Sequence, residues 1–325
     1  MTFELMPDII LSTLLLLMAW GALYAPTRHD AMALFVAFGL VVALIWARLG
    51  APDLALAEAA IGAGLTGVLL LQAARLLPAE SASTEHRPLW FRSSLLFLLV
   101  TTAMFASMIL NNNSLQLAGS GISANVTADS ASLPEMVAAA MGDSGVGHPV
   151  TAVLLNFRAW DTLLELLVLL LALTGVRQLY PGVNRNQQAV ANTIEQTWPL
   201  LLAWARFLAP LLVLTGGYLL WRGADGAGGA FQAGAMLAAA AVILRLTGLL
   251  PGLSWSSLLL RLAVNIGALV FLSVALATLM FGDGWLVYPV QWAGALIVAI
   301  EVFATLSIAV TLSLLVVGEP EELSA

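Results

Sequence analysis

The amino-acid sequence predicts an all-α integral membrane protein with about nine transmembrane helices, and three observations lead to this prediction. Hydrophobic residues make up 61% of the 325 positions, and charged residues make up only 10%. A water-soluble domain carries about 25% charged residues, so this composition does not suit a soluble surface. The apolar residues also gather in runs of about 20, the length that a helix needs to cross the hydrocarbon core.

Each predicted helix corresponds to one apolar run. The runs lie at about residues 8–25, 31–47, 54–77, 93–110, 159–176, 200–221, 229–250, 258–281 and 290–317. The first run resembles a signal peptide in length, but Glu4 and Asp8 precede it where a signal carries basic residues. We therefore expect it to be retained. The third run follows Pro52 and Asp53, a typical helix start.

Polar segments divide these helices into blocks of three, two and four. Residues 78–92 and 178–198 have the composition of linkers, which predicts segments 1–80, 81–180 and 181–325. The polar stretch 111–149 contains no Lys or Arg. Within it, Ser132 and Glu135 have the spacing of a capping box, which predicts a short helix through Met141. The stretch either contacts another subunit or forms a solvated lid.

The arginines predict the orientation, because the chain contains no lysine. With nine spans, nine arginines fall on one side and three on the other. The larger set is Arg28, Arg75, Arg87, Arg92, Arg177, Arg185, Arg206, Arg245 and Arg261; the smaller set is Arg48, Arg158 and Arg222. The positive-inside rule then places the N-terminus outside and the C-terminus in the cytoplasm. We expect a multi-pass protein of the bacterial inner membrane.

Composition alone argues against several chemistries. The absence of cysteine excludes thiolate chemistry and iron–sulfur ligation by this chain. A net charge of −7 argues against a nucleic-acid partner. His29, His86 and His148 fall in loops far apart and are expected to be solvated, so neither a metal site nor a cofactor is predicted. Without lysine or a nucleophile elbow, we do not expect an enzyme.

Five carboxylates are the candidate functional residues. Glu58, Glu165 and Glu301 lie well inside predicted helices, where an ionised group costs about 3 kcal/mol on insertion scales. Asp53 and Asp161 lie near the external ends of the third and fifth helices. Acidic groups that step inward from one face suit proton or sodium translocation. The alternatives are hydrogen bonds between helices for the three glutamates and favourable helix-dipole contacts for the two aspartates.

The spacing of the candidate carboxylates along the chain decides which of them share a helix face. Asp161 and Glu165 are four residues apart, so they share a helix face with a rise of about 6 Å between them. Arg158 could pair with Asp161 three residues later. Asp53 and Glu58 are five apart and about 140° around the helix, so they cannot form the same ladder. The glycine-rich segment 222–231 is expected to be a tight external turn, with a cation contact at Asp225 as the alternative.

These motifs resemble those of Mrp-type sodium/proton antiporters. The stretch Arg48–Leu65 resembles the MbhD-like segment, and Val150–Glu165 resembles the adjoining MbhE-like segment; both commonly form the tail of the large Mrp A subunit. From about residue 200 the chain resembles the four-helix Mrp B subunit, with Glu301 in its last helix. Acidic positions of the first two motifs match Asp53, Glu58, Asp161 and Glu165.

The resemblance implies a fused accessory subunit that lines a sodium or proton route beside antiporter subunits similar to those of complex I. The segment 222–231 departs from the usual His-Gly-His-x-x-Pro-Gly-Gly-Gly-Phe pattern, because both histidines, the proline and one glycine are replaced. Any role of those histidines is therefore in doubt here. Two alternatives stay open: a membrane subunit of a redox-driven pump, similar to hydrogenase or complex I modules, or a non-conducting scaffold.

Overall fold

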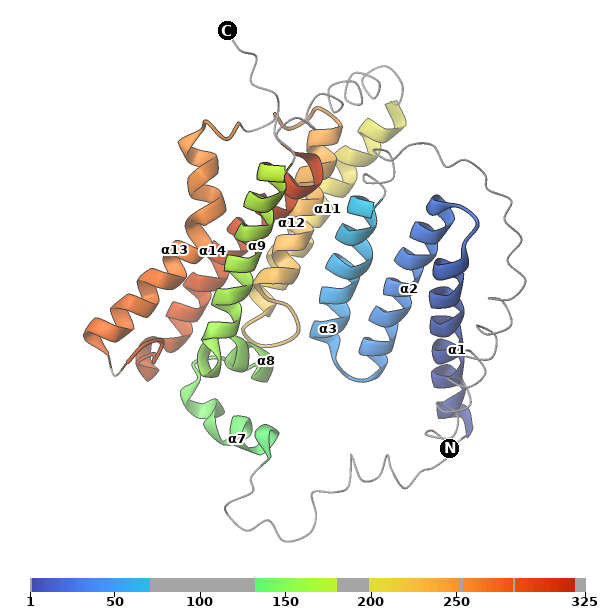
Figure 1. Ribbon diagram of the computed structural model, residues 1–325. Coiled ribbons are helices and arrows are strands. Elements are labelled where there is room, and N and C mark those ends of the chain that lie inside the picture. Colours follow the sequence, from blue (N-terminus) through green and yellow to red (C-terminus); the bar gives the residue numbers. More distant parts are fainter. Residues whose placement is uncertain (1, 71–131, 180–198, 252–253, 283, 319–325) are drawn as a thin grey trace. The chain divides into compact units, whose positions relative to one another are not determined.

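The computed structural model describes residues 2–70, 132–179, 199–251, 254–282 and 284–318 (Figure 1). Within these ranges the secondary structure is helical and contains no strand, which confirms the predicted all-α membrane class. Seven helices there are long and apolar enough to cross a membrane, and α12 (Ala230–Leu246) is shorter. The predicted span 93–110 and the predicted segment boundaries near 80 and 180 lie outside the described residues. The count of nine therefore stays a prediction.

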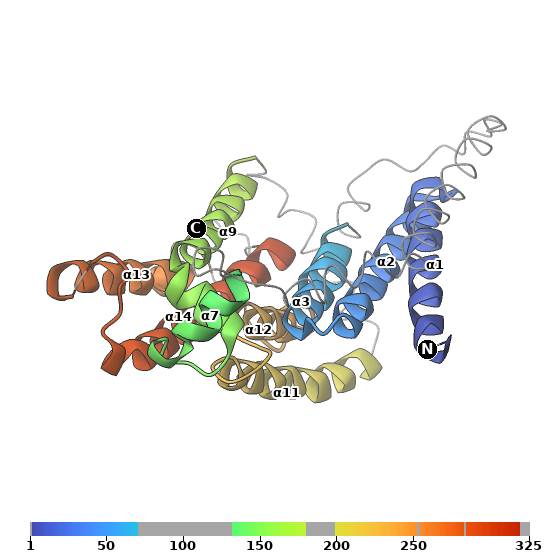
Figure 2. The ribbon, with the colours of Figure 1, turned by 90° about the horizontal axis from the view of Figure 1, so that it is seen from below.

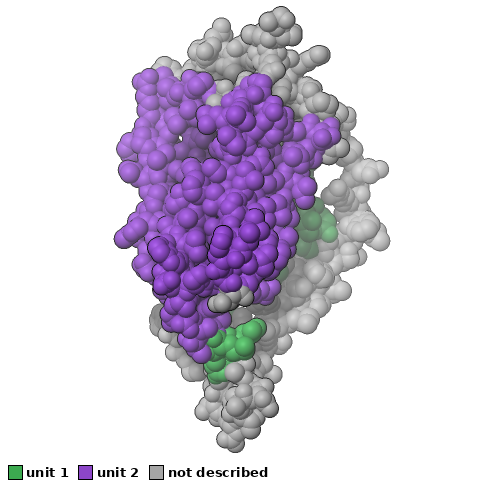
Figure 3. Space-filling view, turned by 90° about the vertical axis from the view of Figure 1, so that its left-hand side faces the viewer, with its two compact units in different colours: residues 1–136 green, residues 137–325 purple. Residues whose placement is uncertain are grey.

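The chain divides into two compact units, residues 1–136 and 137–325, which are coloured separately in Figure 3. Unit 1 contains α1 (Thr2–Tyr24), α2 (Arg28–Arg48) and α3 (Pro52–Ala57). A π-helical stretch, Glu58–Leu65, continues α3, and the apolar span extends to Leu70. The helix α2 packs against both neighbours.

Local sequence explains how unit 1 is built. Thr27 caps α2 by accepting a hydrogen bond from the Asp30 backbone N–H at 3.1 Å. A Cβ atom added at Gly39 would lie 3.2 Å from the backbone of Ala63, so this glycine allows α2 and the π-helical stretch to approach closely. Arg48 at the end of α2 forms an ion pair with Asp8 of α1. These contacts hold α2 against α1 and against the π-helical stretch that begins at Glu58.

Unit 2 is organised around one buried helix. Its elements are the end of α7 (Leu133–Ala140), α8 (Pro149–Ala152), α9 (Ala159–Leu179), α11 (Pro199–Arg222), α12, α13 (Leu258–Phe281) and α14 (Val290–Val317). The helix α14 packs against α9, α12 and α13, and α11 covers α12 (Figure 2). At the start of α7 one of the two hydrogen bonds of the predicted capping box is present: the Ser132 backbone N–H donates to the Glu135 carboxylate at 2.9 Å.

Small residues set the close contacts of α14. A Cβ atom at Gly234 of α12 would lie 2.6 Å from the Ile308 side chain, and one at Gly267 of α13 would lie 2.8 Å from Ser307. The Ser307 hydroxyl donates a hydrogen bond to the Val264 carbonyl of α13. Fourteen of the 28 residues of α14 are buried, Glu301 among them. This helix therefore forms the core in which the deepest candidate carboxylate is held.

Candidate functional site: a buried carboxylate on a glycine-rich loop

The Glu301 side chain lies inside unit 2, with 3% of the residue exposed. Its Oε1 atom would be 3.2 Å from a Cβ atom added at Gly223 and 3.3 Å from one added at Gly229. The carboxylate therefore lies against the backbone of the loop that joins α11 to α12. One turn later, the Thr305 hydroxyl donates to the Glu301 carbonyl at 2.7 Å and also approaches the Ala230 carbonyl at the start of α12.

Glycine is required where this loop turns. Gly228 has φ +152° and Gly229 has φ +109°, conformations that residues with a side chain rarely adopt. A Cβ atom at Gly223 would lie 2.6 Å from the Gly229 Cα atom, so the two sides of the loop touch through their backbones. The segment is thus the tight turn that the sequence predicted. Its lack of side chains at these points leaves room for the Glu301 carboxylate.

A second segment holds the loop from the other side. The backbone N–H groups of Gly147 and His148 both donate to the Ala224 carbonyl at 3.0 Å. The Thr151 hydroxyl donates to the Gly223 carbonyl at 2.5 Å and lies 3.5 Å from Nδ1 of His148. We call residues 144–151 the bracing segment. The sequence predicted a subunit contact or a solvated lid for the stretch 111–149, and it did not predict these hydrogen bonds, because they join positions 72 or more residues apart and leave no local pattern.

The bracing segment also connects the loop to the entrance of α9. The Asn156 side-chain amide donates to the Ser144 carbonyl at 2.9 Å. Residues Val153–Phe157 form a π-helical turn, and the helical conformation is interrupted at Arg158 before α9 begins. The Thr162 hydroxyl spans this break by donating to the Leu154 carbonyl at 2.7 Å. The irregular turn was not predicted, although the predicted helix start at residue 159 is confirmed.

The start of α9 carries the predicted ion pair. Nε of Arg158 lies 2.9 Å from Oδ2 of Asp161, three residues later. Both side chains are well exposed, so the pair contributes about 0–1 kcal/mol of stability. Its main effect is to orient the Asp161 carboxylate at the mouth of the helix.

Glu165 is one turn further along α9, and its side chain is exposed. Its neighbours Leu164 and Val168 are also exposed, at 53% and 63%. The carboxylate therefore lies on the outer surface of unit 2, within the span Ala159–Gln178. The described residues do not enclose it.

Unit 1 holds the other two candidates. Asp53 follows Pro52 in the first turn of α3, where a carboxylate complements the helix dipole. Glu58 begins the π-helical stretch, and its carboxylate folds over Gly62; a Cβ atom there would lie 2.1 Å from Oε1. Such π-helical turns occur frequently at functional sites. The sequence predicted a regular helix here, because this distortion has no simple residue signature.

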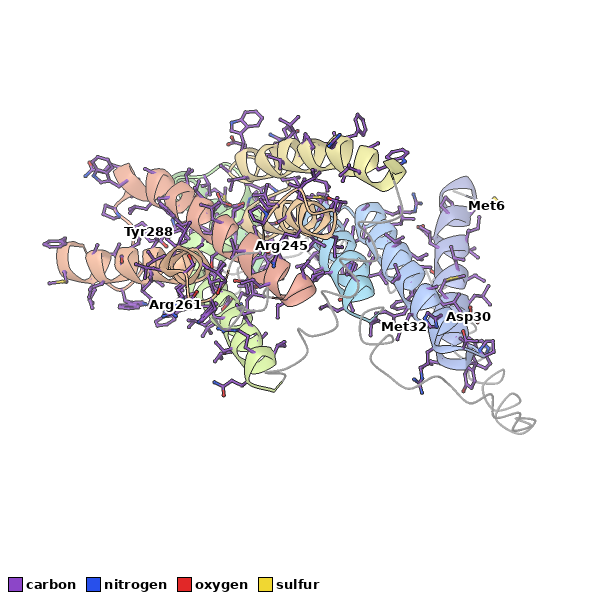
Figure 4. The ribbon with its side chains drawn as sticks, turned by 90° about the horizontal axis from the view of Figure 1, so that it is seen from above. Met6, Asp30, Met32, Arg245, Arg261 and Tyr288 are labelled. Atoms are coloured by element: carbon purple, nitrogen blue, oxygen red, sulfur yellow. The ribbon has the colours of Figure 1, made fainter. Side chains whose placement is uncertain are left out.

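The loop before α14 makes an aromatic contact with α9. Trp285 stacks on Trp160 of α9 with ring centroids 5.5 Å apart. Tyr288, labelled in Figure 4, is 6% exposed. Burial raises the pKa of its phenol above the ordinary value. The stacking of these two tryptophans joins α9 to the entrance of α14.

Comparisons with known proteins agree with this architecture. Residues 13–79 match the MbhD family of MBH subunits, and residues 200–319 match the MnhB family, described as "Domain related to MnhB subunit of Na+/H+ antiporter". These matches confirm the predicted resemblance to MbhD-like and Mrp B-like segments in those two parts of the chain. The intervening MbhE-like segment stays a prediction.

The fold is similar to that of a chain in a solved Mrp complex. A chain of the Mrp complex from Dietzia sp. DQ12-45-1b aligns with a TM-score of 0.67 and 20% identity, over 97% of this chain. The present chain spans only 35% of that Mrp chain. A chain of an archaeal membrane-bound sulfane sulfur reductase aligns over 68% of this chain and 100% of its own, with a TM-score of 0.48 and 22% identity. No protein with a curated description matches the chain.

Proposed function

We propose that this chain, which carries an MbhD segment and an MnhB-related domain, is a non-enzymatic membrane subunit of a multisubunit cation/proton antiporter. In this proposal its intramembrane carboxylates form part of the route for sodium ions or protons. The complex would reside in a bacterial inner membrane with this chain's C-terminus in the cytoplasm. Its partners would be other membrane subunits, including antiporter subunits similar to those of complex I.

The observation that carries this proposal is the exposure of Glu165 on a membrane-spanning helix. An ionised carboxylate in contact with lipid costs about 3 kcal/mol or more, so such a side chain faces protein or water in a working assembly. Asp161 lies one turn nearer the helix entrance and is also partly exposed. The two carboxylates therefore mark a face of α9 that a partner subunit covers, and the ion route follows that interface.

Glu301 would serve the same route at a second position. Its carboxylate lies against the loop backbone at Gly223 and Gly229, and the bracing segment connects that loop to the entrance of α9. A buried carboxylate can exchange its proton for a cation when the surrounding oxygen atoms can coordinate that cation. The scaffold alternative predicts instead that neutral variants of Glu301 and Glu165 conduct normally.

The decisive experiment substitutes Glu165 in the assembled complex. Glu165→Gln keeps size and hydrogen bonding but removes the exchangeable charge, so sodium-dependent proton exchange in everted vesicles should fall at least about tenfold. Glu165→Asp should keep part of the activity. Asp143→Asn, a matched change at an exposed site outside the spans, should exchange normally. Normal exchange by the Gln variant in a fully assembled complex would show that Glu165 is structural.

The MbhD match favours a second candidate, a redox-driven ion pump. In that assembly a neighbouring subunit with iron–sulfur clusters would supply the energy. Purification through a tag on this chain separates the two candidates. Co-purified iron and a hydrogenase-like subunit would replace the antiporter assignment, whereas a complex of membrane subunits alone would support it.

A further inference from the structure

Two arginines from different helices meet at one tryptophan at the end of unit 2 opposite the Arg158–Asp161 pair. Cζ of Arg177, in the last turn of α9, lies 3.8 Å from the centroid of the Trp255 ring. Nε of Arg261, in the first turn of α13, donates to the Trp255 carbonyl at 2.6 Å. One residue thus positions two guanidinium groups, at a place that none of the carboxylates above uses.

The tryptophan is held firmly by the core. Its ring packs against a cluster formed by Leu173 of α9, Leu260 and Val264 of α13, and Leu314 of α14. The cation–π contact places Cζ of Arg177 over the indole ring, and the hydrogen bond to Trp255 uses Nε of Arg261. The Nη atoms of the exposed Arg261 side chain can therefore donate to a further acceptor. Positioning both side chains in advance lowers the entropy cost of binding an anion.

The surroundings of this pair combine positive charge with an apolar surface. Arg245 at the end of α12 donates at 2.8 Å to the Gly318 carbonyl, one turn beyond Leu314 of this cluster, and it is labelled with Arg261 in Figure 4. Along the sequence, within the described parts of α9, α12, α13 and α14, no Asp or Glu stands fewer than ten positions from any of these three arginines. Leu262 and Leu269, which follow Arg261 along α13, are 47% and 50% exposed.

We propose that Arg177, Trp255 and Arg261 form a binding site for the phosphate headgroup of an anionic phospholipid. Both arginines lie at the ends of membrane spans, which is the depth of lipid phosphates. Arginine binds phosphate through its planar fork of N–H donors. The acyl chains would lie along Leu262 and Leu269, which follow Arg261 toward the middle of the α13 span. A soluble phosphate would gain nothing from these exposed leucines, which is why the surface fits a lipid.

The test measures phosphatidylglycerol retained by the full-length purified protein in native mass spectrometry. We expect the wild type to bind phosphatidylglycerol in preference to phosphatidylcholine. The double variant Arg177→Gln/Arg261→Gln should weaken phosphatidylglycerol binding at least tenfold, because it removes both guanidinium groups. The control Arg206→Gln/Arg222→Gln removes the same charge from α11 and should bind as the wild type does.

Further variants keep the test informative if the double variant unfolds. Arg261→Lys keeps the charge but loses the fork and should show an intermediate loss, while Trp255→Phe keeps an aromatic face and should bind nearly normally. Equal loss in the α11 control, or no preference for phosphatidylglycerol in the wild type, would overturn the proposal. Inorganic phosphate that competes equally well would overturn it too, because the acyl chains would then contribute nothing.

Discussion

The hydroxyl of Thr151 donates a 2.5 Å hydrogen bond to the carbonyl of Gly223, and through it the bracing segment holds the loop on which Glu301 rests. Thr151 is 7% exposed, so water does not readily replace this bond. The position of a carboxylate on α14 therefore depends on a residue of a different segment, far away in the sequence.

Removing this hydrogen bond should destabilise unit 2. Thr151→Val keeps the shape but leaves the buried Gly223 carbonyl without its donor, which costs about 1–3 kcal/mol. Thermal unfolding of the detergent-solubilised protein would measure the loss, and Thr151→Ser should restore most of it. Thr174→Val is the control, because its hydroxyl is exposed and bonds only to carbonyls of its own helix. Equal unfolding temperatures for both valine variants would contradict the role of Thr151.

A methyl group at Gly223 should disturb the loop itself. The added Cβ would lie 2.6 Å from the Gly229 backbone and 3.2 Å from the Glu301 carboxylate, so the loop must open. We expect Gly223→Ala to lower both the unfolding temperature and ion exchange. Gly217→Ala, within α11, meets no atom within 4 Å and should raise stability slightly through helix propensity. Similar behaviour of the two variants would show that the loop tolerates a side chain.

The Glu301 carboxylate itself should be required for transport but not for assembly. Glu301→Gln keeps the volume in the buried site and removes the exchangeable charge. Exchange in everted vesicles should fall at least about tenfold, a barrier change of about 1.4 kcal/mol. A blot of the purified complex shows whether the subunits still assemble. Normal exchange at normal assembly would leave Glu301 outside the ion route.

In unit 1, Gly62 should be as important as the carboxylate that covers it. A Cβ atom at Gly62 would collide with Oε1 of Glu58, so Gly62→Ala forces that side chain into another rotamer. If Glu58 takes part in transport, exchange should fall severalfold although the charge is intact. Gly175→Ala, where a Cβ meets no atom within 4 Å, is the matched helix control. Unchanged exchange in Gly62→Ala would show that the folded-over position of Glu58 has no role.

Orientation is tested directly by fusions. A cytoplasm-active reporter fused after Ala325 should fluoresce or function, because the arginine distribution predicts a cytoplasmic C-terminus. A periplasm-active reporter at the same position should be silent. The opposite pair of results would reverse the orientation or change the helix count from odd to even.

The sequence by itself determined the class of the protein, most of its helices and its candidate carboxylates. Apolar runs, the capping-box spacing of Ser132 and Glu135 and the Arg158–Asp161 spacing are local signals. In the described residues they correspond to seven helices of membrane length, to the hydrogen bond from the Ser132 backbone to Glu135 and to the Arg158–Asp161 ion pair. Such features depend on residues within a few positions of one another, so they can be recognised without knowing the fold.

Only the tertiary structure decided which carboxylates are enclosed and which face outward. Glu165 and Glu301 have the same chemistry and similar apolar neighbours in sequence, yet one is exposed on α9 and the other is buried against the glycine-rich loop. Hydropathy describes a residue's neighbours along the chain, whereas burial depends on which other helices pack against it. The sequence predicted the tight turn at 222–231 but not the hydrogen bonds that brace it, because those bonds join segments far apart in the chain. The two π-helical stretches have no simple residue signature, so they were not predicted either.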